Sequence, residues 1–338
     1  MLFGFARTPH RAAGFVRGRS RAPAHDGWCV RDEAIMGTAI RVELWSLDKA
    51  RGDAAAAAVI AEMHRIDRLM SPFKADSELS AINRDAARRA VPVCEELFAL
   101  IAASLRFSDL SDGAFDITYA SVGRLYDYRA GVRPDAAQLA QARAAIGWRG
   151  LELDRAARSV RFTHPLTAID LGGFAKGHAV DNAARILADH GVRHAIVSAG
   201  GDSRLIGDRC GRPWTIAIRD PRRPGEVVAV LPLEETAVST SGDYERYFEI
   251  DGVRCHHLID PKTGRSPDTL RSVTILAADG LTTEALSKTV FVQGLERGMR
   301  LVESLPGVDA VVVDAAGKLH FSSGLLDGVP QTAAVVHQ

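Results

Sequence analysis

The clearest chemical signal in this chain lies at residues 170–181, which read DLGGFAKGHAVD. Asp170 is followed by two glycines, by Lys176 and by a run that suits a helix. Glycines let a ligand approach the backbone closely, and the start of a helix presents unpaired N–H groups to an anion. With the charge of Lys176, these features predict a site for a phosphorylated ligand. A glycine turn that serves only helix packing is the alternative, and the spacing matches neither the Rossmann nor the Walker A motif.

Three further segments combine turns with hydroxyl, histidine and acidic side chains. Residues 196–202 (IVSAGGD) take an apolar strand into a glycine pair followed by Asp202. Residues 239–244 (STSGDY) are rich in hydroxyls, which can hydrogen bond the polar edges of a ligand. Residues 257–264 (HLIDPKTG) begin with His257 at the end of a predicted strand. A lone histidine is commonly structural, but its place beside Asp260 and the hydroxyl-rich segment favours a functional site.

Another candidate segment, residues 113–118 (GAFDIT), follows the end of a predicted helix. Asp116 and Thr118 come shortly after a glycine, and the ring of Phe115 can cover an aromatic ligand. The structural alternative is a turn with a buried phenylalanine.

The elements that must position these segments mix helices with short strands. The periodicity predicts helices at 54–70, 92–110, 133–147, 174–190, 281–292 and 295–304. It predicts strands at 34–45, 151–154, 159–162, 167–170, 193–198, 203–207, 214–218, 226–231, 244–250, 254–259, 271–277, 309–313 and 317–321. Neighbouring strands joined by short turns imply antiparallel sheets, so the predicted fold class is α+β. We expect one compact domain over residues 32–335.

Composition excludes several classes of protein. The 338 residues carry a formal net charge of zero, which argues against a nucleic-acid partner, and no apolar run could span a bilayer. The four cysteines are scattered, without the spacing of a zinc site or a disulfide framework. Residues 1–31 are basic but lack the apolar region of a secretory signal. They are predicted to form a disordered tail, and the chain as written is predicted to be cytoplasmic.

Taken together, the motifs resemble the ApbE family, the FAD:protein FMN transferases once described as thiamine-biosynthesis lipoproteins. The resemblance runs from Met36 to Gly294 in the family's order. The matching segments are MGT at 36–38, Phe73 with SELSAIN at 77–83, AFD at 114–116, DLGGFAKGHAVD at 170–181, SAGGD at 198–202, STSGDY at 239–244, HLIDPKTGRS at 257–266 and TEALSK at 283–288.

The resemblance implies an ApbE-like, T-fold-related architecture that binds FAD and a divalent cation, usually Mg²⁺. Such enzymes transfer FMN from FAD to a Thr or Ser hydroxyl of an acceptor flavoprotein and release AMP. By resemblance, His257 is the base that takes the hydroxyl proton, and Asp260, close to it in the sequence, is the second predicted catalytic residue. The positions that match FAD-contacting residues are Met36, Phe73, Ala114, Phe115, Asp116, Lys176 and Ile259. The metal site would combine a backbone oxygen near Gly173 with residues 284 and 288.

The chain departs from the family at this metal site. The family typically has Asp and, four residues later, Thr, whereas this chain has Glu284 and Lys288. Glutamate can replace aspartate as a ligand, but an ammonium has no lone pair to offer a metal. Three interpretations stay open: Lys288 points elsewhere, its ammonium stands in for part of the cation's charge, or the two residues form a plain ion pair and the metal is weakened or lost. We favour retained activity with an altered metal site.

Alternatives to the transferase follow from this departure. One is an FAD-binding module whose catalysis is weakened or lost, and another is a metal-dependent FAD diphosphatase that yields FMN and AMP. The family is commonly exported, which also sets this chain apart, because no signal or lipidated cysteine is found. The sequence specifies neither the acceptor protein nor the oligomeric state.

Overall fold

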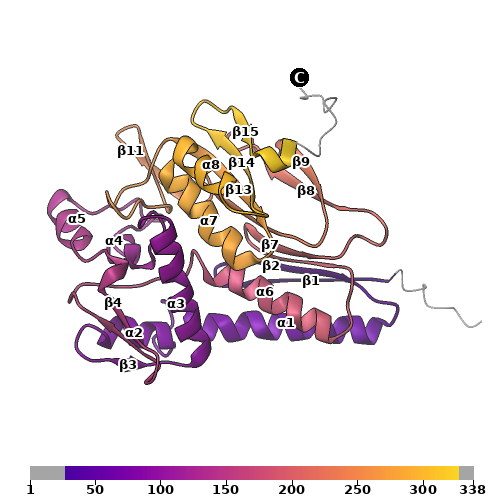
Figure 1. The fold of residues 1–338 in the computed structure, drawn as a ribbon, viewed down its shortest axis with the longest axis horizontal. Helices are drawn as coiled ribbons and strands as arrows, with labels where there is room; N and C mark the ends of the chain where they lie inside the picture. Colours follow the sequence, from indigo (N-terminus) through magenta and orange to yellow (C-terminus); the bar gives the residue numbers. More distant parts are fainter. Residues whose placement is uncertain (1–26, 327–338) are drawn as a thin grey trace, which may run out of the picture.

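An eight-stranded sheet organises the chain, and the computed structural model describes residues 27–326 of it (Figure 1). The strands lie in the order β1 (Trp28–Ile35), β2 (Thr38–Trp45), β6 (Ala195–Ala199), β7 (Asp202–Ile206), β10 (Ala237–Gly242), β13 (Leu270–Ala277), β14 (Asp309–Asp314) and β15 (Leu319–Phe321). Every strand pairing among the described residues is antiparallel. The predicted α+β class is therefore confirmed.

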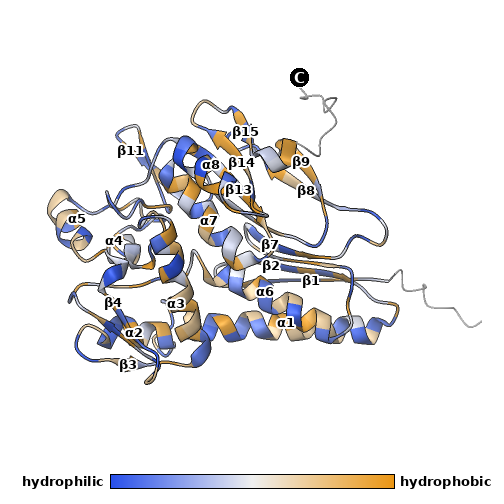
Figure 2. Cartoon of the chain, viewed as in Figure 1, coloured by the Kyte–Doolittle hydropathy of each residue, from blue (hydrophilic) through white to orange (hydrophobic). Residues whose placement is uncertain are grey.

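Four helices cover one face of this sheet (Figure 1). Three of them each pack mainly on two neighbouring strands, and the fourth packs on one strand. They are α1 (Lys49–Met70) over β1 and β2, α6 (Ala175–Asp189) over β6 and β7, α7 (Gly280–Gln293) over β10 and β13, and α8 (Leu295–Glu303) over β14. The sequence of α1 explains why this segment forms a helix that packs on the sheet. The Asp48 side chain accepts the first amide N–H groups, and one face carries the buried residues Val59, Met63, Ile66 and Met70. Figure 2 shows the matching polar residues along this helix.

The central helix α7 differs, because most of its residues are buried on all sides. Adjacent helices also pack on each other, α1 on α6, α6 on α7, and α7 on α8. Within residues 27–326, no helix combines the length and the apolar character that crossing a membrane requires.

A smaller group of elements lies beside the helices, at the lower left of Figure 1. It contains α2 (Glu78–Asp85), α3 (Glu95–Leu110), α4 (Ala120–Gly123), α5 (Ala136–Arg143) and a sheet of β3 (Val91–Pro92), β5 (Ser159–Phe162) and β4 (Leu151–Asp154). Two hairpins complete the fold, β8 (Trp214–Arg219) with β9 (Val227–Leu233) and β11 (Tyr247–Ile250) with β12 (Val253–His256), followed by α9 (Ser323–Leu326). Trp214 of the first hairpin packs on Leu205, Val238 and Leu276 of the sheet.

Several predicted elements need correction. The single strand expected at 34–45 is a hairpin, because Met36 and Gly37 have φ values of 55° and 68° that reverse the chain between β1 and β2. Residues 28–31 of the predicted disordered tail 1–31 belong to β1, and residues 1–26 of that tail lie outside the described part. The helix expected from Pro92 begins at Glu95, because Pro92 belongs to β3.

Other differences concern strands. Residues 167–170 form no strand, and β11 starts at Tyr247, after a turn at the beginning of the predicted strand 244–250. Strand β12 ends at His256, so His257 follows it directly. Helix α2 and the polar strand β10 were not predicted. The four cysteines are free, as their spacing indicated.

Helices α6 and α7 cross at two glycines that bring their backbones into contact. A Cβ added to Gly177 would lie 2.2 Å from the carbonyl oxygen of Gly280, and one added to Gly280 would lie 2.7 Å from the carbonyl oxygen of Gly177. The side chain of Asp181 in α6 accepts the amide N–H groups of Gly280 and Leu281 at 2.8 and 3.0 Å. The start of α7 is therefore fixed to the first turns of α6.

We predict that Gly177→Ala lowers the free energy of unfolding by about 1–3 kcal/mol, because the methyl group forces the two helices apart. Urea unfolding of both proteins measures the difference. Gly147→Ala is the control, since a Cβ at Gly147 meets nothing within 4 Å. Equal losses in the two variants would contradict the prediction.

Candidate active site

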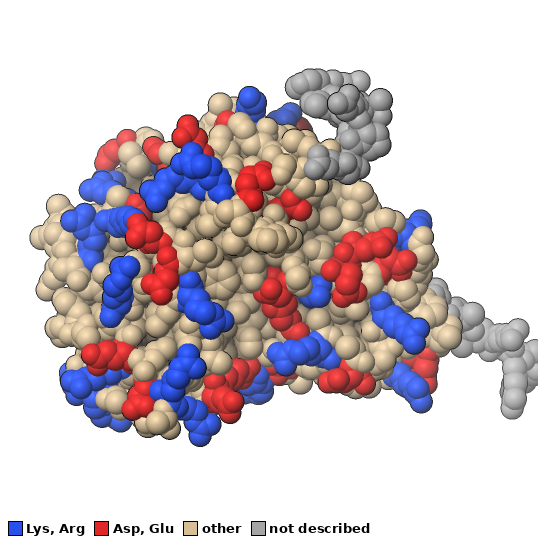
Figure 3. Space-filling view, in the orientation of Figure 1, with Lys and Arg blue, Asp and Glu red and all other residues tan. Residues whose placement is uncertain are grey.

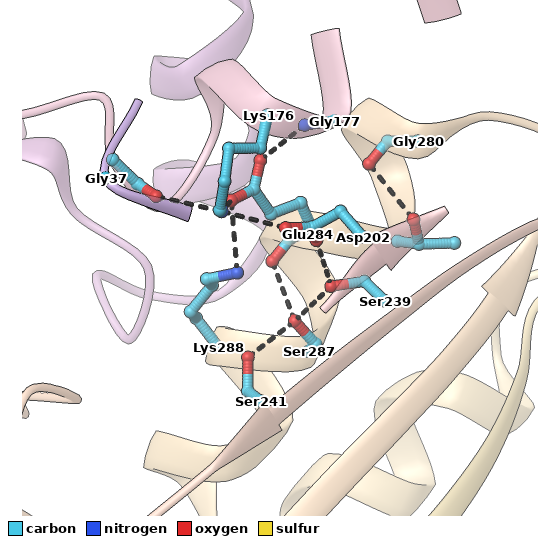
Figure 4. Close-up of polar contacts among 12 residues, drawn as sticks. Gly37, Lys176, Gly177, Asp202, Ser239, Ser241, Gly280, Glu284, Ser287 and Lys288 are labelled. Carbon is cyan, nitrogen blue, oxygen red and sulfur yellow. Dashed lines mark hydrogen bonds and ion pairs between the residues drawn. The ribbon is translucent and has the colours of Figure 1, made fainter. Parts of the chain in front are cut away.

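Two carboxylates and two lysines form a buried charge cluster where α6 and α7 meet (Figure 4). Lys176 follows the glycine turn, Asp202 begins β7, and Glu284 and Lys288 lie one turn apart on α7. The Lys176 ammonium lies 2.8 Å from Asp202 Oδ2 and also pairs with Glu284 Oε1, while the Lys288 ammonium lies 3.3 Å from the same Glu284 oxygen. The Glu284 side chain has no exposed surface.

Backbone groups and hydroxyls satisfy the rest of the cluster. Glu284 Oε2 accepts the amide N–H of Gly177 at 2.7 Å, and Asp202 Oδ1 accepts the hydroxyl of Ser239 at 2.6 Å. The Ser287 hydroxyl lies 3.1 Å from that of Ser239 and 2.8 Å from that of Ser241. The hydroxyl-rich segment predicted to contact a ligand thus supports the charge cluster through its alternate side chains.

The cluster controls its own ionisation. Burial alone would lower the pKa of Lys176, but the attraction of Asp202 and Glu284 is stronger and raises it. Burial lowers the pKa of Lys288, which Glu284 and Asp202 offset only in part and the nearby Lys176 reinforces. Burial would raise the pKa of Asp202, but the two lysines together lower it. Lys176 and Asp202 therefore each favour the charged form of the other.

His257 lies beside this cluster, directly after β12, with its amide N–H donated to the carbonyl of Arg246 at 3.1 Å. Burial, followed by the charges of His256, Lys288 and Arg246, lowers the pKa of His257 to about 3. Its buried Nδ1 has no hydrogen-bond partner among the described residues. The lowered pKa keeps the imidazole neutral at neutral pH, so a ring nitrogen has a lone pair for a proton, although the same shift makes the imidazole a weaker base than an exposed histidine.

Asp260 shapes the turn that follows His257. Its carboxylate accepts the amide N–H of Lys262 at 2.9 Å, and its carbonyl accepts that of Gly264 at 2.7 Å. Within residues 27–326, no hydrogen bond joins Asp260 to His257. Ile259 is buried in the same loop. Asp260 therefore stabilises the turn that begins three residues after His257 in the sequence.

Asp116 lies at a second part of the site, a cavity of about 390 Å³. Its carboxylate accepts the amide and hydroxyl of Thr118 at 2.8 and 2.7 Å and the amide of Trp148 at 3.0 Å. Burial raises the pKa of Asp116. The cavity is also lined by Pro261 and Lys262 of the loop after His257. The structure thus brings the AFD and HLIDPKTG motifs to one cavity.

The remaining predicted FAD-contacting residues differ in exposure. Ala114 and Phe115 are buried, and the Phe115 ring packs 5.4 Å from the ring of Phe174, so Phe115 belongs to the core. Phe73 is 92% exposed in the loop before α2. Met36 forms the β1–β2 turn. Among the described residues, no hydrogen bond or ring contact links Phe73 to the other predicted site residues.

Sequence reasoning missed Arg246, whose side chain connects two motifs. Its guanidinium donates to the carbonyl of Gly37 at 3.2 Å, and its charge acts on His257 and Asp170. Within the described part of the chain it has no carboxylate partner at ion-pair distance. An arginine in a turn before a strand carries no sequence signal, so only the fold reveals it.

The predicted metal residues do come together, but their chemistry does not suit a divalent cation. Lys288 passes against Gly173, where an added Cβ would lie 3.3 Å from the lysine Cε. Both oxygens of Glu284 already have partners, as do both oxygens of Asp202. No group of three or more His, Cys, Asp or Glu side chains suited to a metal occurs among residues 27–326.

Fold and site together define an α+β protein with a helix-covered antiparallel sheet and a buried charge cluster between its two central helices. The model of the ApbE family matches residues 36–312. The chain belongs to the ApbE family.

Relatives of known name are similar over most of the chain. It is 33% identical to the FAD:protein FMN transferase of Treponema pallidum (strain Nichols), covering 94% of this chain and 91% of the relative. It is 34% identical to one from Klebsiella pneumoniae (strain 342), with 81% of each covered. The crystal structure of the ApbE protein from Thermotoga maritima matches with a TM-score of 0.83 and 34% identity, covering 88% of this chain and 98% of the other. The flavin transferase ApbE from Vibrio cholerae matches with a TM-score of 0.80 and 28% identity, covering 89% and 99%.

The lowered pKa of His257 predicts an acid-sensitive fold. With a pKa of about 3 when folded and about 6.5 when unfolded, the unfolded state binds more protons between these values. Stability therefore rises with pH over this window, by at most about 1.4 kcal/mol per pH unit from this group. His257→Gln should flatten that slope, as measured by urea unfolding at several pH values from 4 to 7. His190→Gln, at an exposed histidine, should keep it, and identical slopes in both variants would refute the prediction.

Proposed function

We propose that this chain is an FAD:protein FMN transferase that moves FMN from FAD to a Thr or Ser hydroxyl of an acceptor flavoprotein and releases AMP. The names of its relatives support the activity. The observation that carries the proposal is the buried, uncharged imidazole of His257, whose Nδ1 has no partner in the described chain and lies within the field of Lys288.

FAD would bind across the two parts of the site. The cavity beside Asp116 suits one end of the dinucleotide, because carboxylate, amide and lysine groups reach it from three segments. The exposed ring of Phe73 can cover a flavin or adenine ring. Met36, Ala114, Phe115 and Ile259 would shape the walls, and Lys176 would hold the glycine turn by its 3.1 Å hydrogen bond to the carbonyl of Gly172.

In the reaction, the acceptor hydroxyl oxygen attacks the phosphorus that belongs to the FMN half of FAD. The new P–O bond forms as the bond to the AMP phosphate breaks, and AMP leaves with the electron pair. The hydroxyl proton passes to the imidazole of His257, which is neutral before the reaction. Charge builds up on the leaving phosphate, so cations near the reacting phosphorus supply most of the catalysis.

Asp260 acts in this proposal as a positioning residue. Its turn fixes the loop between His257 and the cavity-lining Lys262, so both parts of the site keep their spacing.

The proposed partner is an acceptor protein, and the net charge of zero argues against a nucleic acid. Lys and Arg side chains alternate with Asp and Glu over the face shown in Figure 3, in keeping with the net charge of zero. A cytoplasmic location stays a prediction, which fractionation of the source cells would test.

The proposal is tested by incubating the purified chain with FAD and an acceptor domain that carries a flavinylation threonine. Covalent flavin fluorescence of the acceptor on a denaturing gel, with an equal amount of AMP by chromatography, supports the transferase. FMN and AMP without labelled acceptor would indicate a diphosphatase. Bound but unreacted FAD would indicate a binding module.

We predict that His257→Ala abolishes transfer while FAD stays bound, because only the proton acceptor is lost. Gel fluorescence measures transfer, and quenching of flavin fluorescence measures binding. His190→Ala, at an exposed histidine directly after α6, should retain wild-type transfer. Wild-type transfer by His257→Ala would remove this residue from the base role.

We predict that Asp116→Asn weakens FAD binding about tenfold, since an amide cannot accept all the hydrogen bonds that the carboxylate accepts. Titration of FAD followed by fluorescence checks this. Asp189→Asn, at the exposed end of α6, is the control. Unchanged affinity of Asp116→Asn in a folded protein would place FAD elsewhere.

A further inference from the structure

The metal site expected from the family is the place where this chain differs most in chemistry. The side chains of Glu284 and Lys288 share one face of α7, four residues apart. The Lys288 side chain runs from this helix toward the glycine turn before α6, with its Cε close to Gly173. It therefore fills the space between the turn and α7, which is where the resemblance puts the cation.

The oxygens around this space are already used. Magnesium requires near-octahedral oxygen ligands at short distances, and carboxylates are its usual protein ligands. Glu284 Oε1 is shared by two ammonium groups, and Oε2 accepts the amide of Gly177. Asp202 divides its oxygens between Lys176 and Ser239. A divalent cation entering here would lack free carboxylate oxygens and would meet the positive charge of Lys288.

We infer that the Lys288 ammonium replaces the divalent cation of this family, so that the chain binds FAD and transfers FMN without a metal ion. The inference rests on the proposed function for its catalytic part. Its binding part, that no divalent cation occupies the Glu284 site, stands on the geometry alone.

The charge balance supports the replacement. Lys176 and Lys288 neutralise Asp202 and Glu284, so the cluster is complete without a metal. Arg246 adds a further positive charge beside His257 and has no carboxylate partner in the described chain. Arg246 is therefore the positive charge beside His257 that the buried carboxylates do not already neutralise.

The Lys288 ammonium also lies close to the groups that this role requires. It pairs with Glu284 at 3.3 Å, its Cε lies near Gly173, and its charge acts on His257, the proposed proton acceptor. A cation at the glycine turn can neutralise a phosphate whose ester bond is being exchanged.

Manganese binding is the first test, because it needs no turnover. The full chain and a Glu284→Asp/Lys288→Thr variant, which restores the family's residue types, are titrated with Mn²⁺ and free Mn²⁺ is followed by electron paramagnetic resonance. We expect no stoichiometric Mn²⁺ binding by the wild-type chain. The double variant should bind Mn²⁺ at least about tenfold more tightly than the wild-type chain does. Lys318→Thr, at an exposed lysine, should behave as wild type. Stoichiometric Mn²⁺ binding by the wild-type chain, lost on Glu284→Gln, would overturn the inference.

The second test compares FAD affinity and AMP release in EDTA and in magnesium. Wild-type values should differ by less than about twofold between the two conditions, whereas the double variant should lose at least about tenfold in EDTA. Lys288→Met, which keeps the length of the side chain without its charge, should weaken FAD binding in both conditions. Loss of wild-type FAD binding in EDTA and its return with magnesium would overturn the inference. If AMP is never released, the proposed function fails, and Mn²⁺ and FAD binding still decide the metal question.

Discussion

The buried carboxylate of Glu284 is the constraint on which the centre of this fold depends. An ionised carboxylate without exposed surface costs several kcal/mol unless cations and N–H groups surround it. Its partners come from two helices, Lys176 and Gly177 of α6 and Lys288 of α7. The helices must therefore approach closely, which the glycines at 177 and 280 permit because neither carries a Cβ. The burial of Glu284 therefore depends on the close crossing of α6 and α7.

The sequence predicted the long elements well, because hydrophobic periodicity reports burial. Helices α6, α7 and α8 begin and end within about two residues of their predicted ranges. Strand β10 was missed because its inward side chains are hydroxyls: Ser239 and Ser241 lie in the interior by hydrogen bonding Ser287. The β1–β2 hairpin was missed because a methionine adopts the left-handed conformation at its turn. Both cases depend on partners that are distant in sequence.

In the candidate site, too, local sequence predicted some residues, whereas others depend on partners that are distant in sequence. Lys176, His257, Glu284 and Lys288 were singled out by residue type and motif, and the structure brings the three charged ones together with the imidazole nearby. Arg246 and the pairing of Asp202 with Lys176 follow from the order of strands in the sheet, which no local pattern reveals. Asp260 was predicted by its nearness to His257 in sequence, but the turn directs its carboxylate to the backbone of Lys262.

Among residues 27–326, the order of the strands leaves β1 and β15 at the two edges of the large sheet. Unpaired edge backbones invite other chains to add a strand, which is a common origin of aggregation. Strand β15 is only three residues long, so it offers little to pair with. Strand β1 places exposed Arg31 and Asp32 along its edge, and Asp32 is held by Arg41 at 2.9 Å. Charge on the exposed residues of one border and the short length of the other are features that disfavour pairing of this sheet with a further strand.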